Sequence, residues 1–61
     1  MLIPEFSENK DLSMLLYFNA EGMDISKMYD ELEKTYVCFE KMNKVIKDGK
    51  QYIVLEIKDE N

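Results

Sequence analysis

Apolar residues recur along much of the chain at spacings of three and four, which is the period of one face of an α-helix. Three segments show this spacing, at Leu12, Leu15 and Leu16; at Ile25, Met28, Tyr29 and Leu32; and at Cys38, Phe39, Met42, Val45 and Ile46. Asp24 and Thr35 precede the second and third segments and are residue types that cap helix N-termini. Gly22 suits the left-handed residue that follows a helix. The pattern predicts three helices within residues 11–47.

Residues 51–58 alternate instead, with Ile53, Leu55 and Ile57 on one side and Tyr52 and Val54 on the other. This period of two predicts a β-strand. The favoured fold class is therefore mostly α with a C-terminal β-strand. We expect a single small domain over residues 1–61. Its expected parts are an N-terminal lead (1–10), a three-helix core (11–47) and a final strand (50–58).

Two of the expected helices have a strand alternative. Residues 12–18 are a short apolar run, and residues 35–42 begin with β-branched and aromatic residues, so either segment suits a strand. Helix is favoured for the second because Lys41 and Asn43 break the alternation that Val37 and Phe39 begin. The alternative fold is α+β in the order β-α-β-β, with strands at 12–18, 35–42 and 50–57 around a helix at 24–34. Residues 47–50 would then form a hairpin turn.

The favoured order of elements resembles a known family. Residues 25–32, 34–37 and 44–49 carry the resemblance, which is to the winged-helix branch of the helix-turn-helix DNA-binding domains. Small archaeal, bacterial and viral transcription regulators contain such domains. The resemblance implies a sequence-specific regulator that binds double-stranded DNA by placing the helix at 35–47 in the major groove. The DNA-binding residues it implies are Lys34, Thr35, Tyr36, Val37, Lys41, Asn43, Lys44, Lys47 and Lys50.

The charge distribution is uneven. Eight lysines and thirteen carboxylates give a net charge of −5, which argues against unspecific coating of nucleic acid. Residues 34–50 nevertheless hold five lysines against two carboxylates, a local +3, and the remaining residues sum to −8. A basic segment on an acidic body fits a selective DNA reader, and it fits equally a protein partner with an acidic patch. The competing hypothesis is a small acidic protein-interaction module or inhibitor, of the DNA-mimicking kind, that binds no DNA.

Catalytic chemistry has little support in the composition. Histidine is absent, Cys38 is the sole cysteine, and the two glycines lie too far apart for a phosphate-binding loop. We therefore expect no enzyme, no cofactor and no metal site. A single cysteine favours a reducing cytoplasm, and no apolar run is long enough to cross a membrane. We also expect a homodimer, because strand 51–58 would present a free edge with Tyr52 and Val54 as interface residues.

Overall fold

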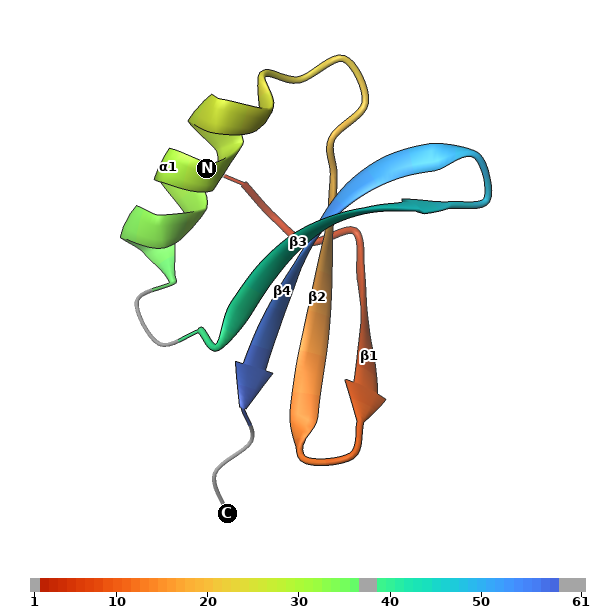
Figure 1. The fold of residues 1–61 in the computed structure, drawn as a ribbon, viewed down its shortest axis with the longest axis vertical. Coiled ribbons are helices and arrows are strands. Elements are labelled where there is room, and N and C mark those ends of the chain that lie inside the picture. Colours follow the sequence, from red (N-terminus) through yellow and green to blue (C-terminus); the bar gives the residue numbers. More distant parts are fainter. Residues whose placement is uncertain (1, 37–38, 59–61) are drawn as a thin grey trace.

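The computed structural model describes residues 2–36 and 39–58, which form one antiparallel sheet and one helix (Figure 1). The sheet has the strand order β1-β2-β4-β3, so β1 and β3 are its edges and β2 and β4 its centre. In chain order the elements are β1 (Phe6–Lys10), β2 (Ser13–Asn19), α1 (Ile25–Thr35), β3 (Lys41–Lys47) and β4 (Lys50–Lys58).

Two tight hairpins build the sheet. The β3–β4 turn consists of Asp48 and Gly49, whose φ angles of 52° and 77° are both left-handed. This is the backbone of a type I′ turn, whose twist matches that of the flanking strands, and Asp-Gly is one of its preferred sequences. Asp11, with a φ of 54°, turns the chain between β1 and β2. The hairpin turn that the alternative fold places at residues 47–50 is thus present.

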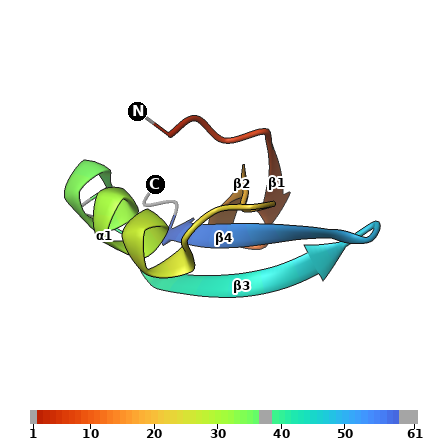
Figure 2. The same ribbon diagram turned by 90° about the horizontal axis from the view of Figure 1, so that it is seen from above.

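Helix α1 begins where the sequence predicts. The Asp24 side chain accepts a hydrogen bond from the backbone N–H of Lys27 at 3.3 Å, which satisfies one of the free donors at the helix N-terminus. Met28 and Leu32, one turn apart, are the fully buried side chains of the helix. They pack against one face of the sheet, and Figure 2 shows the β3–β4 turn at the far end of the sheet from α1.

The main core lies between α1 and this face of the sheet. The two central strands, β2 and β4, contribute every second residue to it, as expected for a sheet packed on a helix. The buried members of this cluster are Leu16, Phe18, Ala20, Met28, Leu32, Ile53 and Leu55. Its strand residues are direct cross-strand neighbours, since Leu16 pairs with Leu55 and Phe18 with Ile53.

The predicted fold class, mostly α with three helices, is wrong: within residues 11–47, α1 is the one helix among the described residues. Residues 12–18 fall largely in β2, which is central and buries Leu16 and Phe18 on one face and Tyr17 on the other. A strand buried on both faces is apolar almost throughout. Its residues therefore satisfy helical spacing without being helical, which is why the pattern misled.

The expected helix at 35–47 is also wrong. Thr35 ends α1 instead of capping a new helix, and residues 41–47 form the edge strand β3. Many positions of an edge strand are exposed to solvent, as Lys41 and Asn43 are here. These polar residues therefore interrupt the alternation of apolar and polar positions without loss of stability. The alternative order β-α-β-β comes closer, since it places strands at β2 and β4 and a helix at α1. It lacks β1, and its strand at 35–42 begins several residues before the observed β3.

Candidate functional site

The face of the sheet turned away from α1, here called the open face, carries a second and smaller apolar cluster. Its buried members are Tyr17, Tyr52 and Val54, with Phe6, Leu15 and Val45 packed against them half-buried. The Phe6 and Tyr17 rings stack with centroids 4.4 Å apart, and the Tyr52 ring meets both edge-on at 5.5 and 5.9 Å. Offset and edge-on contacts of this kind are the favoured geometries of aromatic pairs.

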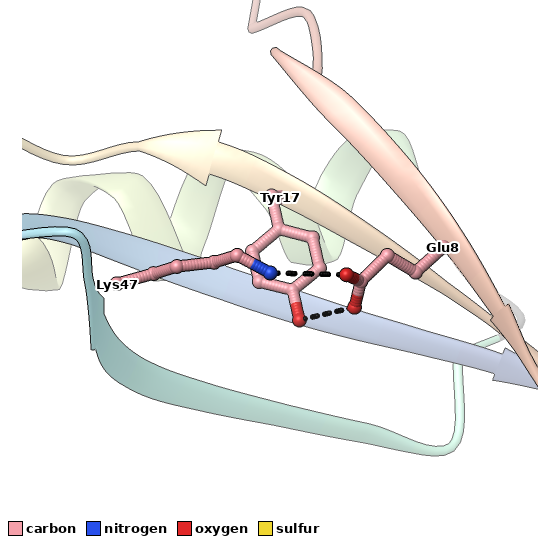
Figure 3. A network of polar contacts seen from close by, with 3 residues as sticks. All are labelled: Glu8, Tyr17 and Lys47. Carbon is pink, nitrogen blue, oxygen red and sulfur yellow. Dashed lines mark hydrogen bonds and ion pairs between the residues drawn. The ribbon is translucent and has the colours of Figure 1, made fainter.

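Glu8 and Lys47 meet at the Tyr17 ring of this cluster (Figure 3). The Tyr17 hydroxyl donates a hydrogen bond of 2.8 Å to one oxygen of Glu8, and the Lys47 ammonium pairs with the other oxygen at 3.0 Å. The same ammonium lies 5.2 Å from the centre of the Tyr17 ring and 5.4 Å from that of Phe6. We call Glu8, Tyr17 and Lys47 the clasp.

The clasp connects the two edges of the sheet, because Glu8 belongs to β1 and Lys47 to β3. Two strands lie between these edges, and Glu8 shares a cross-strand row with Lys41, six residues along β3 from Lys47. In a flat sheet the backbones of Glu8 and Lys47 would therefore be more than about 20 Å apart, beyond the reach of the two side chains. A 3.0 Å contact between their side chains requires the edges to curl toward each other on the open face. The open face is therefore concave.

A second carboxylate anchors the remaining tyrosine. Glu5, just before β1, accepts hydrogen bonds from the Tyr52 hydroxyl at 2.9 Å and from the Asn19 side-chain amide at 3.1 Å. Both buried tyrosines thus reach a glutamate at the rim of the open face. This arrangement satisfies the polar tips of two large rings that no further layer of structure covers.

These hydrogen bonds shift the titration of the groups involved. The Lys47 ammonium, followed by the Tyr17 hydroxyl, lowers the pKa of Glu8 below its usual value. The Asn19 amide and then the Tyr52 hydroxyl lower the pKa of Glu5 in the same way. Hydrogen bonding to Glu8 raises the pKa of Tyr17 and of Lys47. The ionised carboxylates and the protonated partners are therefore the states that the fold favours.

A hollow of about 340 Å³ occupies the concave side of the sheet. Leu15, Val45 and Val54 contribute its apolar lining, with Tyr17 of the clasp beside them. The polar lining residues are Lys10, Asp11, Ser13, Lys41, Asn43 and Glu56, and the Ser13 hydroxyl donates to Glu56 at 3.1 Å. This volume is at the lower end of the range for small-molecule sites, and the charges of the lining residues sum to zero.

The outer edge of β3, here called the β3 edge, presents free backbone groups. Residues flanking a two-residue hairpin turn form a hydrogen-bonded pair, and such pairs alternate along the ladder. Lys47, Val45, Asn43 and Lys41 therefore direct their backbone groups toward β4. Those of the intervening residues, 42, 44 and 46, point away from the sheet, where no described strand pairs with them. The opposite edge, β1, is shorter, with five residues against seven.

The structure disperses the residues predicted to contact DNA. Lys34 and Thr35 end α1, and Tyr36 caps it and lies edge-on to Phe18 with centroids 5.7 Å apart. Val37 is outside the described residues. The others lie in the β3–β4 hairpin: Lys41, Asn43, Lys47 and Lys50 on the open face, and Lys44 on the opposite face. No single helix surface unites them, because the predicted recognition helix does not exist.

The residues predicted to form a dimer interface are inside the molecule. β4 lies between β2 and β3, so the strand expected to offer a free edge has none. Tyr52 and Val54 belong to the open-face cluster and are 4% and 7% exposed. Dimerisation stays a prediction, but the free edges are those of β1 and β3.

Sequence reasoning missed Glu5, Phe6 and Glu8, since no strand was expected before residue 11. A weak signal was present, because Asp11 is a turn-forming residue type between two stretches that can extend. Five residues with one aromatic side chain are too few to define a period. The clasp also depends on residues 39 positions apart, which no local pattern reveals.

Among residues 2–36 and 39–58, no group of three side chains is arranged to hold a metal ion, and no helix is long and apolar enough to cross a membrane. No protein-family model matches the sequence, and neither a curated protein nor a solved structure shows detectable similarity to it.

Proposed function

We propose that this protein is a binding module that takes an extended, acidic segment of a partner protein as an added strand on the β3 edge. The observation that carries the proposal is a free edge of seven residues on which three are lysine, in a chain whose net charge is −5. Strand addition supplies affinity through backbone hydrogen bonds, and the side chains of the edge supply selectivity.

Charge supports an acidic partner. Residues 41–50 hold four lysines and one aspartate, a local +3, whereas the rest of the chain sums to −8. The β3–β4 hairpin is thus a basic arm on an acidic body, and it attracts acidic segments. A second copy of the chain is a poorer occupant, because edge-to-edge pairing of two β3 strands would bring lysines close together.

Duplex DNA fits this surface less well than an acidic polypeptide. Of the lysines at 41–50, Lys41, Lys47 and Lys50 lie on the open face and Lys44 on the other, so the positive charge is divided between two faces. Lys47 is already paired with Glu8, and Glu56 shares the open face, where it would oppose phosphates. Arginine, the side chain best suited to reading guanine, is absent.

The test blocks the β3 edge without changing its charge. Ile46 is 72% exposed and its N–H points away from β4, so Ile46→Pro removes one outward donor and keeps the β3–β4 ladder. Ile46→Val is the matched control, since valine keeps both the N–H and an apolar, β-branched side chain. The probe is a seven-residue peptide of valine, threonine and glutamate, and its binding is monitored by the amide chemical shifts of the protein. Two further ligands are tested in parallel: a peptide in which lysine replaces glutamate, and a DNA duplex of random sequence.

We expect the acidic peptide to shift the amides of residues 42, 44 and 46, and the lysine peptide to leave them unchanged. Loss of one hydrogen bond and the clash of the proline ring should weaken binding by about tenfold or more, whereas Ile46→Val should bind nearly as before. If Ile46→Pro loses its dispersed spectrum, Lys44→Glu provides the same test through charge. Equal binding by the blocked variants, or binding of DNA alone, would overturn the proposal.

A further inference from the structure

We infer that the β3 edge selects a specific order of residues in its partner: an acidic residue between two apolar ones, each two positions away. The inference rests on the proposed function and deepens it. A residue in an added strand lies opposite one residue of β3, and its side chain points to the same face of the sheet. The order of side chains along each face of β3 therefore dictates the complementary order in the partner.

The face on the α1 side carries Met42, Lys44 and Ile46 in turn. Met42 is half-buried against the main core, and Ile46 is exposed because the hairpin extends beyond α1 (Figure 2). Lys44, between them, has no ion-pair partner among the described residues. Apolar partner residues opposite Ile46 and Met42 would bury apolar surface, and an acidic residue opposite Lys44 would meet an unpaired charge.

The open face adds weaker preferences. Val45 packs half-buried against the open-face cluster and favours an apolar neighbour, whereas Asn43 is exposed at the hollow and favours a polar one. Lys41 stands opposite Glu56 in the sheet, and Lys47 is paired with Glu8. Both lysines already lie near a carboxylate, so Lys44 is the position at which a partner's acid has the most effect.

An antiparallel partner gives the order a direction. Every strand pair of this sheet is antiparallel, and antiparallel pairing is the slightly more stable kind. Read from its N-terminus, the partner strand passes residue 47 first and residue 41 last. The complementary sequence is TVVETVE, whose fourth residue is the glutamate opposite Lys44 and whose second and sixth residues are the valines opposite Ile46 and Met42.

The experiment compares this peptide with TEVVTEV, which has the same composition but places valine opposite Lys44 and glutamate opposite both apolar residues. Binding is followed by amide shifts of the full chain. The misordered peptide can place an acidic residue opposite Lys44 only by sliding two positions and losing two pairs. We expect TVVETVE to bind about five- to tenfold more tightly.

A charge exchange tests the position itself. The Lys44→Glu variant should prefer TVVKTVE to TVVETVE, whereas Lys27→Glu, an equal change of charge on α1, should keep the original preference. Equal binding of TVVETVE and TEVVTEV at residues 42–46 would overturn the inferred order while leaving strand addition intact. Absence of shifts at the β3 edge with every peptide would overturn strand addition as well.

Discussion

The two faces of the sheet bury aromatic and aliphatic side chains by different means. On the side of α1, a helix covers the central strands, and Phe18, Leu32 and Leu55 are at most 1% exposed. On the open face, no helix residue joins the cluster. Tyr17 and Tyr52 contact each other and Phe6, and Glu8 and Lys47 meet at the Tyr17 ring. One face relies on a second layer of structure, and the other on curvature and polar anchors.

This difference separates the kinds of change to which each face responds. A dry, close-packed face loses stability when volume is removed, because a cavity remains. The open face contains groups whose charge matters, so hydrogen bonds and pH affect it as well as volume. The following substitutions measure the two faces on one scale, the free energy of unfolding from denaturant titration.

Leu32→Ala should have the largest effect. Leu32 is fully buried between α1 and the sheet, so its truncation leaves a cavity and should cost about 2–5 kcal/mol, enough to unfold much of so small a domain. Leu12→Ala is the matched control, since Leu12 lies in the β1–β2 turn, is 69% exposed and should change stability by less than about 0.5 kcal/mol. Similar losses for both leucines would show that the helix face is not the main core.

Phe6→Ala should have an intermediate effect. The Phe6 ring stacks on Tyr17 but is only half-buried on an edge strand, so the loss of apolar contact should cost about 1–3 kcal/mol. Phe6→Leu keeps much of the apolar volume and should recover most of this. A loss at Phe6 as large as that at Leu32 would mean that the open face contributes as much as the helix face.

The fold was predictable where one face of an element alone is buried. The helix face of α1 alternates cleanly between core and solvent, so its limits and its Asp24 cap followed from the sequence. β4 is the exception, since both of its faces are buried. It was predictable because Ile53, Leu55 and Ile57 alternate with other residue types up to the polar Glu56 and Lys58. β2, apolar on both faces, and β3, half-exposed at an edge, each imitate helical spacing. Only the pairing partners of these strands distinguish them from helices, and those lie far along the chain.

The candidate site was predictable only in its charge. The excess of lysine over residues 34–50 was visible, and the structure places most of it in the β3–β4 hairpin. What the sequence could not show is that Lys47 is neutralised by Glu8 and that Lys44 is not. The difference arises from the register and curvature of the sheet, which are properties of the assembled strands.

Tyr17→Phe should have a small effect. The change removes the hydroxyl that donates to Glu8 and keeps the ring contacts with Phe6 and Tyr52. Because the Glu8 carboxylate is partly exposed and can bind water instead, we expect a loss of about 0.5–1 kcal/mol. Tyr29→Phe, on the half-buried side of α1, is the matched control, since no described residue accepts from its hydroxyl. Equal effects of the two changes would show that the hydrogen bond from Tyr17 to Glu8 does not stabilise the open face.

Acid should weaken the open face by a smaller amount than any of these truncations. The pKa values of Glu5 and Glu8 are lowered in the fold, so their contribution is present above the pKa of an unfolded glutamate. It is lost as pH falls through the lowered pKa values, because the protonated carboxyls no longer hold Lys47, Tyr17, Tyr52 and Asn19 as strongly. Both carboxylates are open to solvent, which keeps the effect small.

The measurement is the unfolding midpoint between neutral pH and about pH 3, a window that spans the usual glutamate pKa. The double variant Glu5→Gln, Glu8→Gln should begin less stable than the natural chain at neutral pH and lose less on acidification, so that the two curves converge. A second double variant, Asp30→Asn with Glu33→Gln, removes the same two charges from the exposed surface of α1 and controls for the change in total charge. Parallel curves for the double variant and the natural chain would mean that these carboxylates contribute nothing to stability, and that packing alone stabilises the aromatic cluster of the open face.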